Sequence, residues 1–322
     1  MRAKKLQNLL LLSWLFLLAQ SAQADSIDDW LDKMSEASQR QNFQGTLVIR
    51  QLDKMQAIRV KQGFDSSGSW QTLESLTGED QTIIRHNNKV TTIFPAKKLV
   101  TISDELVGAL DKNPLHPALP ENRNALKKLY SLELSGQDRI ANKSAQILQM
   151  IPHDQHRYGY VFWLDQQSGL LLKCDLLDEK GKILEQLMYS NVELLSSPPK
   201  NSIDVDVLKT YRKIRLMDEQ GVRQQNWKAS ELPVGFELIR AVKVNYHNQK
   251  TPAYHMVYSD GMASVSVFVE QRKALDNPVM GLSTMGPVNA YSSFTDDAYV
   301  TVIGEVPSAT VQMIAKSIEP LN

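Results

Sequence analysis

Apolar and polar residues alternate along much of the chain, a pattern that is typical of β-strands with one buried face. The clearest stretch is RYGYVFWLDQQSGLLLKCDLLDEKGKILEQLMYS at Arg157–Ser190, where turns at Gln166–Gly169 and Asp178–Gly181 separate three strands. One face of the first strand holds Tyr158, Tyr160, Phe162 and Leu164, and the other holds Gly159, Val161, Trp163 and Asp165. Both faces are largely apolar, so we expect one to meet the core and the other to meet something else.

The same pattern predicts a large antiparallel sheet in the region before about residue 197. A helix opens this region, because Ser26 can cap it and apolar residues from Ile27 to Met34 recur at helical spacing. A second helix is expected near Asn122–Tyr130. The other expected strands are Thr46–Gln51, Ala57–Gln62, Trp70–Leu76, Gln81–Arg85, Lys89–Phe94, Leu99–Ile102, Ser131–Leu134 and Ser144–Ile151. Such a sheet must curl or be covered, since it would otherwise expose its edges and an apolar face.

A segment rich in serine and proline, Ser196–Asn201, marks a domain boundary. The polar residues from there to about Gln225 are expected to form a linker, with a short helix around Val205–Met217. A second, smaller α+β domain is predicted to begin at Trp227. Its expected strands are Phe236–Val244, Tyr254–Ser259, Met262–Glu270, Asn289–Phe294 and Tyr299–Gly304. The chain therefore belongs to the α+β class, with two unrelated domains.

Three further features are expected in the second domain. Asp260-Gly261 is a strong signal for a two-residue hairpin turn. NPVMGLSTMGP at Asn277–Pro287 is expected to be a loop, and its methionines make it either a flexible contact surface or a disordered segment. A helix is expected to close the chain, with an apolar stripe formed by Val311, Ile314, Ala315 and Ile318.

Residues 1–24 have the three parts of a secretory signal peptide. Met1–Lys5 is basic, Leu9–Ala19 is apolar, and Ala22-Gln23-Ala24 offers a cleavage site between small residues. An uncleaved membrane anchor is the alternative, but spanning a bilayer takes about 20 apolar residues, more than this run supplies. We therefore expect an exported chain that is cut after about Ala24.

Charge and cysteine content narrow the functional class. The chain has 36 basic and 36 acidic residues, and removing Arg2, Lys4 and Lys5 leaves 33 against 36, a net charge near −3. That balance argues against a nucleic-acid-binding protein. Cys174 is the single cysteine, so the chain forms no internal disulfide and its cores must hold the fold. Its place in an apolar strand favours a packed thiol over a reactive one.

No motif in the sequence indicates catalysis, so we predict a chain that is not an enzyme and needs no metal or cofactor. His153, Asp154 and His156 lie close in sequence, but zinc requires three or four convergent ligands, and a solvated loop explains them better. There is no G-x-S-x-G motif. Asp165 and Asp175 are conceivable as paired carboxylates, although solvated strand or turn positions are the better interpretation.

Basic and aromatic residues mix at Arg85–Lys98 and Arg157–Trp163. This mixture suits an anionic amphiphile, with cations for the head groups and rings for the chains, and it also suits ordinary strand surface. From the residues alone, the leading hypothesis is an exported binding protein whose curved sheet has an apolar concave face. An enzyme is the second hypothesis.

Four segments of the chain resemble the RseB/MucB family, periplasmic regulators of the envelope-stress sigma factor. The first is the strand region RYGYVFWLDQQSGLLLKCDLLDEKGKILEQ at Arg157–Gln186. The others are LPVGFEL at Leu232–Leu238, VYSDGMASVSVFVE at Val257–Glu270 and AYVTVIGEVPSATVQMIAKSI at Ala298–Ile318. The resemblance covers nearly all of the mature chain in the same order.

The resemblance implies a fold and a function. The N-terminal domain, residues 25–197, would have the antiparallel half-barrel fold of the carriers LolA and LolB, covered by helices, and would sense lipid. Residues 198–226 would link it to residues 227–322, which would bind the periplasmic domain of a transmembrane anti-sigma factor of the RseA or MucA type. Binding would shield that factor from regulated proteolysis in the periplasm. Lipopolysaccharide or another lipid would release the shield.

Strand alternation alone supplies the candidates for the lipid cavity, Trp70, Phe162 and Met188. The hairpin that resembles the family's supplies the candidates for partner contact, Tyr258, Met262 and Phe268. Two alternatives remain at this point: a lipoprotein or lipid carrier of the LolA/LolB type with an accessory second domain, and a periplasmic hydrolase. The sequence also leaves open a homo-oligomer.

Overall fold

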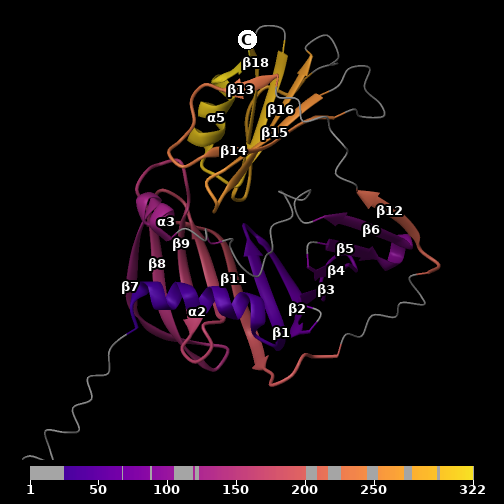
Figure 1. The fold of residues 1–322 in the computed structure, drawn as a ribbon, viewed down its shortest axis with the longest axis vertical. Helices are drawn as coiled ribbons and strands as arrows, with labels where there is room; N and C mark the ends of the chain where they lie inside the picture. Colours follow the sequence, from indigo (N-terminus) through magenta and orange to yellow (C-terminus); the bar gives the residue numbers. More distant parts are fainter. Residues whose placement is uncertain are drawn as a thin grey trace, which may run out of the picture.

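The structure is a computed structural model that describes residues 25–66, 68–87, 89–104, 119, 123–200, 209–216, 226–244, 253–271, 278–295 and 298–321. These residues form two sheet domains, one stacked on an end of the other (Figure 1). The predicted signal peptide and most of the predicted linker lie outside the described residues. Within them, no helix has the length and apolar character that crossing a membrane requires.

The first domain is built on one twelve-stranded sheet with the order β12-β6-β5-β4-β3-β2-β1-β11-β10-β9-β8-β7. The strands are β1 (Phe43–Gln51), β2 (Lys54–Asp65), β3 (Gly68–Ser75), β4 (Thr82–His86), β5 (Lys89–Phe94), β6 (Leu99–Asp104), β7 (Tyr130–Ile140), β8 (Lys143–Pro152), β9 (Gly159–Asp165), β10 (Leu171–Leu177), β11 (Ile183–Leu194) and β12 (Arg212–Leu216). All neighbours pair antiparallel except β12 and β6, which pair parallel. The predicted sequential order is confirmed within β1 to β6 and within β7 to β11, but it breaks where the two runs join, because β1 pairs with β11.

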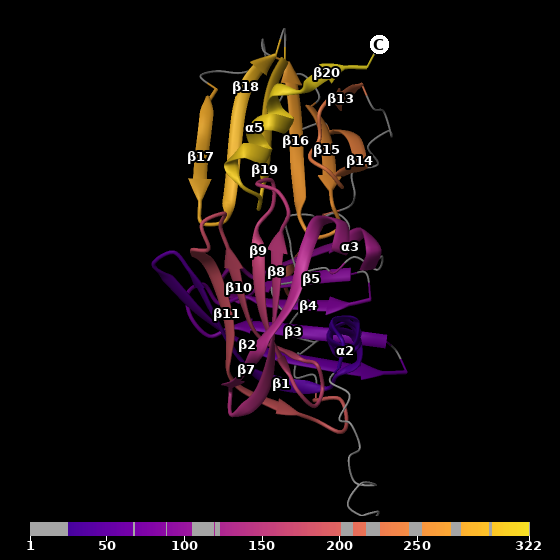
Figure 2. The same cartoon turned by 90° about the vertical axis from the view of Figure 1, so that its left-hand side faces the viewer.

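This sheet is strongly curved. In Figure 2 the strands β7 to β11 run steeply, whereas β1 to β5 cross behind them at a large angle. The pairing register of β1 and β11 shifts between Thr46 and Leu47, at the join of the two halves. A β-bulge of this kind bends a strand and increases the local twist. The curved sheet has an inner face, and the first helix lies against it.

Helix α2 (Ile27–Arg40) fills part of the concave side and contacts β2, β7 and β10. Ser26 caps it in a capping box with Asp29, as the sequence predicts. At its other end, the side-chain amide of Gln62 on β2 donates hydrogen bonds to the Ala37 and Gln41 carbonyl oxygens. The helix is thus fixed to the sheet at its C-terminus by polar contacts and along its length by the buried residues Trp30, Leu31, Met34 and Ala37.

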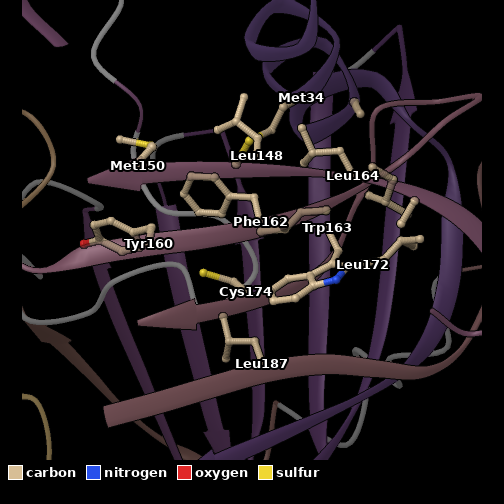
Figure 3. Close-up of a cluster of buried hydrophobic side chains, with 14 of the residues drawn as sticks. Met34, Leu148, Met150, Tyr160, Phe162, Trp163, Leu164, Leu172, Cys174 and Leu187 are labelled. Carbon is tan, nitrogen blue, oxygen red and sulfur yellow. The ribbon is translucent and has the colours of Figure 1, made fainter. Parts of the chain in front are cut away.

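The core of the first domain lies between α2 and the inner face of β8 to β11 (Figure 3). Phe162 is fully buried there, and Leu148, Cys174 and Leu187 occupy paired positions on the neighbouring strands. Burial raises the pKa of the Cys174 thiol well above its ordinary value, which confirms the predicted packed thiol. The described part of the domain also has two short helices, η1 (Pro95–Lys97) and α3 (Arg123–Leu129), the latter where the sequence predicts it.

The second domain has a six-stranded sheet with the order β14-β15-β16-β19-β18-β17. Its elements are β14 (Glu237–Val244), β15 (Ala253–Ser259), β16 (Ser264–Gln271), β17 (Gly281–Met285), β18 (Val288–Thr295), β19 (Ala298–Gly304) and α5 (Ser308–Lys316), with β13 (Trp227–Ala229) pairing β20 (Ile318–Pro320) beside them. Helix α5 packs across β17, β18 and β19 on one face of the sheet (Figure 2). A valine-rich core forms beneath it. The predicted α+β class, a curved antiparallel sheet with covering helices plus a smaller α+β domain, is confirmed.

Four local predictions are wrong. Residues 212–216 form strand β12, not part of a helix, because pairing with the edge of β6 outweighs a weak helical pattern. Residues 281–285 of the predicted loop form strand β17. The β15–β16 connection has four residues, 260–263, because Ser259 pairs with Ser264. Ile318, expected on the last helix, lies in β20 after α5 has ended at Lys316.

Candidate functional site

A buried ion pair joins the two domains. Arg157 lies in the connection from β8 to β9, and Asp260 in the loop between β15 and β16. The Arg157 Nη1 donates to the Asp260 Oδ2 at 2.7 Å, and neither side chain has exposed surface. The Arg157 Nη2 donates to the Val234 carbonyl oxygen at 2.6 Å. A buried guanidinium is tolerated only with such partners, so Arg157 ties the first domain to two separate segments of the second.

Asp154 completes the set of acceptors around Arg157. Its Oδ1 accepts from the Arg157 Nε, and its Oδ2 accepts from Nη2, each at 3.1 Å. Burial acts to raise the Asp154 pKa, but hydrogen bonds from Arg157 and from the His156 backbone N–H outweigh it, and the pKa is lowered. Asp154 and Asp260 therefore share the Arg157 cation. Asp154 binds it with both oxygens within the first domain, and Asp260 binds it with one oxygen from the second domain.

The loop that carries Asp260 is shaped by its own carboxylate. Asp260 Oδ1 accepts hydrogen bonds from the backbone N–H groups of Met262, at 2.9 Å, and Ala263, at 2.8 Å. One carboxylate oxygen thus folds the loop while the other meets Arg157. Met262, at the tip, is buried and belongs to the hydrophobic cluster of the first domain. The hairpin loop therefore inserts an apolar side chain as well as a charge into its neighbour.

A second polar contact lies beside the first. The Tyr158 hydroxyl lies 3.0 Å from the Pro287 carbonyl oxygen and 3.1 Å from that of Val306, and it accepts from the Asn289 amide at 3.0 Å. Burial raises the Tyr158 pKa, so the phenol stays protonated and can donate to one of these carbonyls. Nearby, the Thr310 hydroxyl in α5 donates to the His156 carbonyl oxygen at 2.8 Å.

These contacts make a continuous interdomain junction, formed by Asp154–Tyr158 of the first domain and by Val234, Asp260, Met262, Asn289 and Thr310 of the second. Its ion pair and hydrogen bonds join the two domains in the orientation that the structure shows.

Gly235 sets the approach of the second domain to helix α3. Its φ is +86°, and a Cβ there would lie 2.9 Å from the Leu129 Cδ2. We expect Gly235→Ala to lower the free energy of unfolding by about 1–3 kcal/mol, the strain of an L-residue in this region plus the clash. Gly181→Ala is the matched control, since Gly181 has φ +76° with nothing within 4 Å of a Cβ. Equal losses for the two variants in urea unfolding would contradict a junction contact at Gly235.

The residues considered for catalysis or metal binding have other partners. The His153 ring bonds the Lys128 carbonyl oxygen and the Ser131 hydroxyl, and Asp154 holds Arg157. Among the described residues, no group of three or more His, Cys, Asp or Glu side chains could hold a metal ion. The expected solvated loop agrees with the exposure of these residues, since His153 is exposed and the Asp154 side chain keeps 29% of its surface while it pairs with the buried Arg157.

Asp165 and Asp175 do not form a carboxylate pair. The Asp165 Oδ2 accepts from the Ser168 backbone and hydroxyl, at 2.9 and 2.7 Å. Asp175 accepts from Gln186 at 2.6 Å and pairs with Lys173 at 3.1 Å. Both carboxylates are buried, so the expectation of solvated positions is wrong. They are stabilised because each has local donors.

The three candidate lipid residues occupy two faces of the sheet. Phe162 is on the inner face, within the core of Figure 3. Trp70 pairs with Gly63, and the next residue, Gln71, pairs with Gln62, whose side chain meets α2. Successive residues of a strand point to opposite faces, so Trp70 faces away from α2. Met188 pairs with Lys173, one position beyond the inner pair of Leu187 and Cys174, so it points to the opposite face, where it is half-buried and packs against the same hydrophobic cluster. These side chains do not line one inner wall, and lipid contact by any of them stays a prediction.

The three candidate partner residues are also separated. Tyr258 is buried in the second core, where its hydroxyl accepts from the Ala229 N–H. Met262 is buried in the junction. Phe268 lies half-buried on the sheet face away from α5, stacked on His255 with ring centroids 4.4 Å apart. Phe268 is the one of the three that a partner can reach without disturbing a core, and partner contact stays a prediction for all of them.

His255 gives the second domain a pH dependence. Burial and, to a smaller extent, the nearby Arg240 charge lower its pKa from an ordinary 6.5 to about 4. Because the folded pKa is below the unfolded one, His255 contributes full stability above about pH 6.5 and loses it as the pH falls towards 4. We expect the free energy of unfolding to fall through this window. His255→Gln should make the slope of stability against pH shallower, and an unchanged slope would contradict the assignment.

Sequence inspection did not identify the Arg157–Asp260 pair. One signal was present: Arg157 stands directly before a strand with two apolar faces, where a lone cation needs a buried acceptor. Its acceptor lies 103 residues further along the chain, and nothing in the local pattern indicates that distance.

Comparisons with known proteins agree over nearly the whole chain. The profile of the MucB/RseB N-terminal domain matches residues 26–208, and that of the MucB/RseB C-terminal domain matches residues 221–319. "Sigma factor AlgU regulatory protein MucB" of Pseudomonas aeruginosa is 30% identical over 320 residues, 97% of each chain. "Sigma-E factor regulatory protein RseB" of Haemophilus influenzae is 28% identical over 313 residues, 96% of each chain.

Solved structures of similar proteins include two complexes. In the complex of Pseudomonas aeruginosa MucA and MucB, the matched chain is 30% identical, with a TM-score of 0.72 over 92% of this chain and 99% of that one. In the crystal structure of MucB with MucA(peri), the matched chain is 28% identical, with a TM-score of 0.70 over 92% of this chain and 100% of that one.

Proposed function

The chain belongs to the MucB/RseB family, and on this premise we propose that it is a negative regulator of an envelope-stress sigma factor. It acts in the periplasm by binding the periplasmic domain of a MucA-type transmembrane anti-sigma factor, and it turns over no substrate. The observation that carries the proposal is the match, over both domains together, to MucB chains crystallised with MucA. The proposal concerns a whole two-domain protein, because the match extends across the junction.

Binding would shield the anti-sigma factor from the protease that starts its degradation. An extended periplasmic segment is a protease substrate only while it is free, so the bound fraction sets the rate of cleavage. The two domains present a large surface for such a segment, and the junction holds them in one orientation. A change in that orientation would change the shape offered to the partner.

Lipid would act as the release signal. A ligand shifts a binding equilibrium only if it prefers the unbound state, so lipid must favour an arrangement of the chain that binds the partner less well. The inner face offers acyl chains the apolar side chains of β8 to β11. At one end of β2, β3 and β4 the same face also buries three polar side chains, Gln62, Gln71 and Arg85, which suits a head group. Phe162 has no exposed surface, so an acyl chain that reaches it must part the packed side chains.

A transcriptional reporter tests the regulatory role. Cells that lack this chain should show high transcription from a promoter of the envelope-stress sigma factor, and export of the chain should lower it. A form without residues 1–24 remains in the cytoplasm and serves as the control. Unchanged transcription on deletion and on restoration would contradict the proposal.

Purified components test the finer steps. The chain should slow cleavage of the anti-sigma periplasmic domain by its initiating protease, and added lipopolysaccharide should restore the rate. Protection that persists at saturating lipopolysaccharide would remove the lipid signal and leave the binding function in place.

A further inference from the structure

Strand β17 forms an outer edge of the six-stranded sheet. It pairs with β18 on one side, and no other described strand pairs with it on the other (Figure 2). Its turn is Gly286-Pro287, and the pair that closes the hairpin is Met285 with Val288. Hydrogen-bonding positions alternate along an antiparallel pair, so in a two-residue hairpin of this kind the N–H and C=O groups of Leu282 and Thr284 point to the free side.

This edge lacks the features that usually keep sheet edges from pairing. Natural edge strands carry charges, prolines or bulges. The hairpin from Pro278 to Thr295 contains no charged residue, and its prolines lie outside the paired strands. Its apolar side chains are also open to solvent, with Val279 75%, Met280 49%, Leu282 48% and Met285 71% exposed. An uncharged, apolar edge of this kind indicates a surface that is covered in the working complex.

The apolar edge continues onto the first domain. A Cβ on Gly286 would lie 3.1 Å from the Gln51 Cγ, so the end of the β17–β18 hairpin touches the end of strand β1. Beside Gln51, Leu52 in the β1–β2 turn and Met55 near the start of β2 are 60% and 67% exposed. A segment lying along β17 would therefore pass from the second domain to the first next to the junction.

We propose that the free edge of β17 takes up an extended, apolar segment of the anti-sigma periplasmic domain as a seventh strand. This proposal rests on the proposed function and names its contact surface. The occupant is a polypeptide, because the edge offers N–H donors and C=O acceptors that alternate along the strand. An extended backbone carries acceptors and donors at the same spacing and can pair with all of them. Acyl chains would leave these groups without partners, so the same surface does not suit lipid.

A pair of variants isolates the backbone contribution. Leu282→Pro removes the outward N–H and the side chain, and Leu282→Ala removes only the side chain. Proline is tolerated on an edge strand where its nitrogen faces solvent, so both full-length variants should fold, which thermal unfolding checks. In titrations with the MucA-type periplasmic domain, we expect Leu282→Pro to bind about tenfold more weakly than Leu282→Ala, the factor for one unpaired hydrogen bond.

Amide hydrogen exchange gives a readout that needs no variant. In the unmodified complex, the Leu282 and Thr284 amides should exchange slowly, and in the free chain they should exchange rapidly. Equal binding by both variants, or amides that are already protected in the free chain, would overturn the proposal. A change in oligomeric state of Leu282→Pro with unchanged affinity would also overturn it, by assigning the edge to a second copy. If the unmodified chain does not bind the periplasmic domain at all, the proposed function fails instead.

Discussion

Replacing Arg157 by methionine is expected to lower the free energy of unfolding by about 3–5 kcal/mol, the usual effect of removing one partner from a buried ion pair. The change leaves the fully buried Asp260 carboxylate without its cation and the Val234 carbonyl without its donor. Methionine keeps much of the side-chain volume, so the loss reflects charge more than packing. Urea unfolding followed by tryptophan fluorescence measures it, and the transition should broaden or divide as the domains uncouple.

Arg59→Met is the matched control. Arg59 also makes a two-oxygen contact with a carboxylate, that of Glu74 at 2.8 Å, but both side chains are more than 40% exposed. Exposed pairs contribute about 0–1 kcal/mol. Similar losses for the two variants would mean that water reaches the junction, and the coupling role of Arg157 would be lost. Adding Asp260→Leu to Arg157→Met should recover part of the stability, since it removes the stranded charge.

Truncating Phe162 to alanine is expected to lower the free energy of unfolding by about 3–5 kcal/mol, as for other large-to-small changes in packed cores. Phe162 has no exposed surface, and its ring stacks on Tyr160 with centroids 5.6 Å apart. The surrounding sheet is fixed by backbone pairing on both sides, so it cannot collapse to fill the space. Chemical denaturation gives the change in stability.

Phe64→Ala provides the comparison, because Phe64 is 39% exposed on the same sheet. Its loss should be much smaller, since less apolar area leaves water on folding. If Phe162→Ala were no more destabilising than Phe64→Ala, Phe162 would line a space that is already open. That result would support a preformed lipid cavity over one that forms only when side chains part.

The sequence predicts the elements of this fold well where the pattern is long and periodic. The meander from β1 to β6 and the strands β8 to β11 follow directly from alternation, and Ser26 with Asp29 marks the start of α2. Strands β12 and β17 were missed for a physical reason. Each is five residues long and forms because it pairs with a strand at the edge of a sheet. The local pattern of apolar and polar residues contains no information about that partner strand.

The site was less predictable than the fold. Alternation assigns two faces to a strand, but it does not say which face of a curved sheet is the inner one. All three lipid candidates were expected on one inner wall, but Phe162 lies in the core, Trp70 points away from α2, and Met188 packs half-buried against the core from the opposite face of its strand. The junction was not predicted at all, because it needs Arg157 and Asp260 to meet across two domains. Only long-range contacts in the folded chain bring them together.

The junction also decides how the two halves of the proposed function are connected. Lipid would bind the first domain, and the partner would contact the second, so one must influence the other through Arg157, Tyr158 and their acceptors. Arg157→Met should therefore weaken the effect of lipopolysaccharide on partner binding even where partner binding itself persists. Linkage requires the reciprocal result, a weaker effect of the partner on lipid affinity.

The most direct test of the account is calorimetric titration of the MucA-type periplasmic domain into the full mature chain. We predict saturable binding, with a negative heat-capacity change because apolar surface such as that of β17 is buried. The absence of heat, together with separate elution of the two proteins in size-exclusion chromatography, would contradict the account.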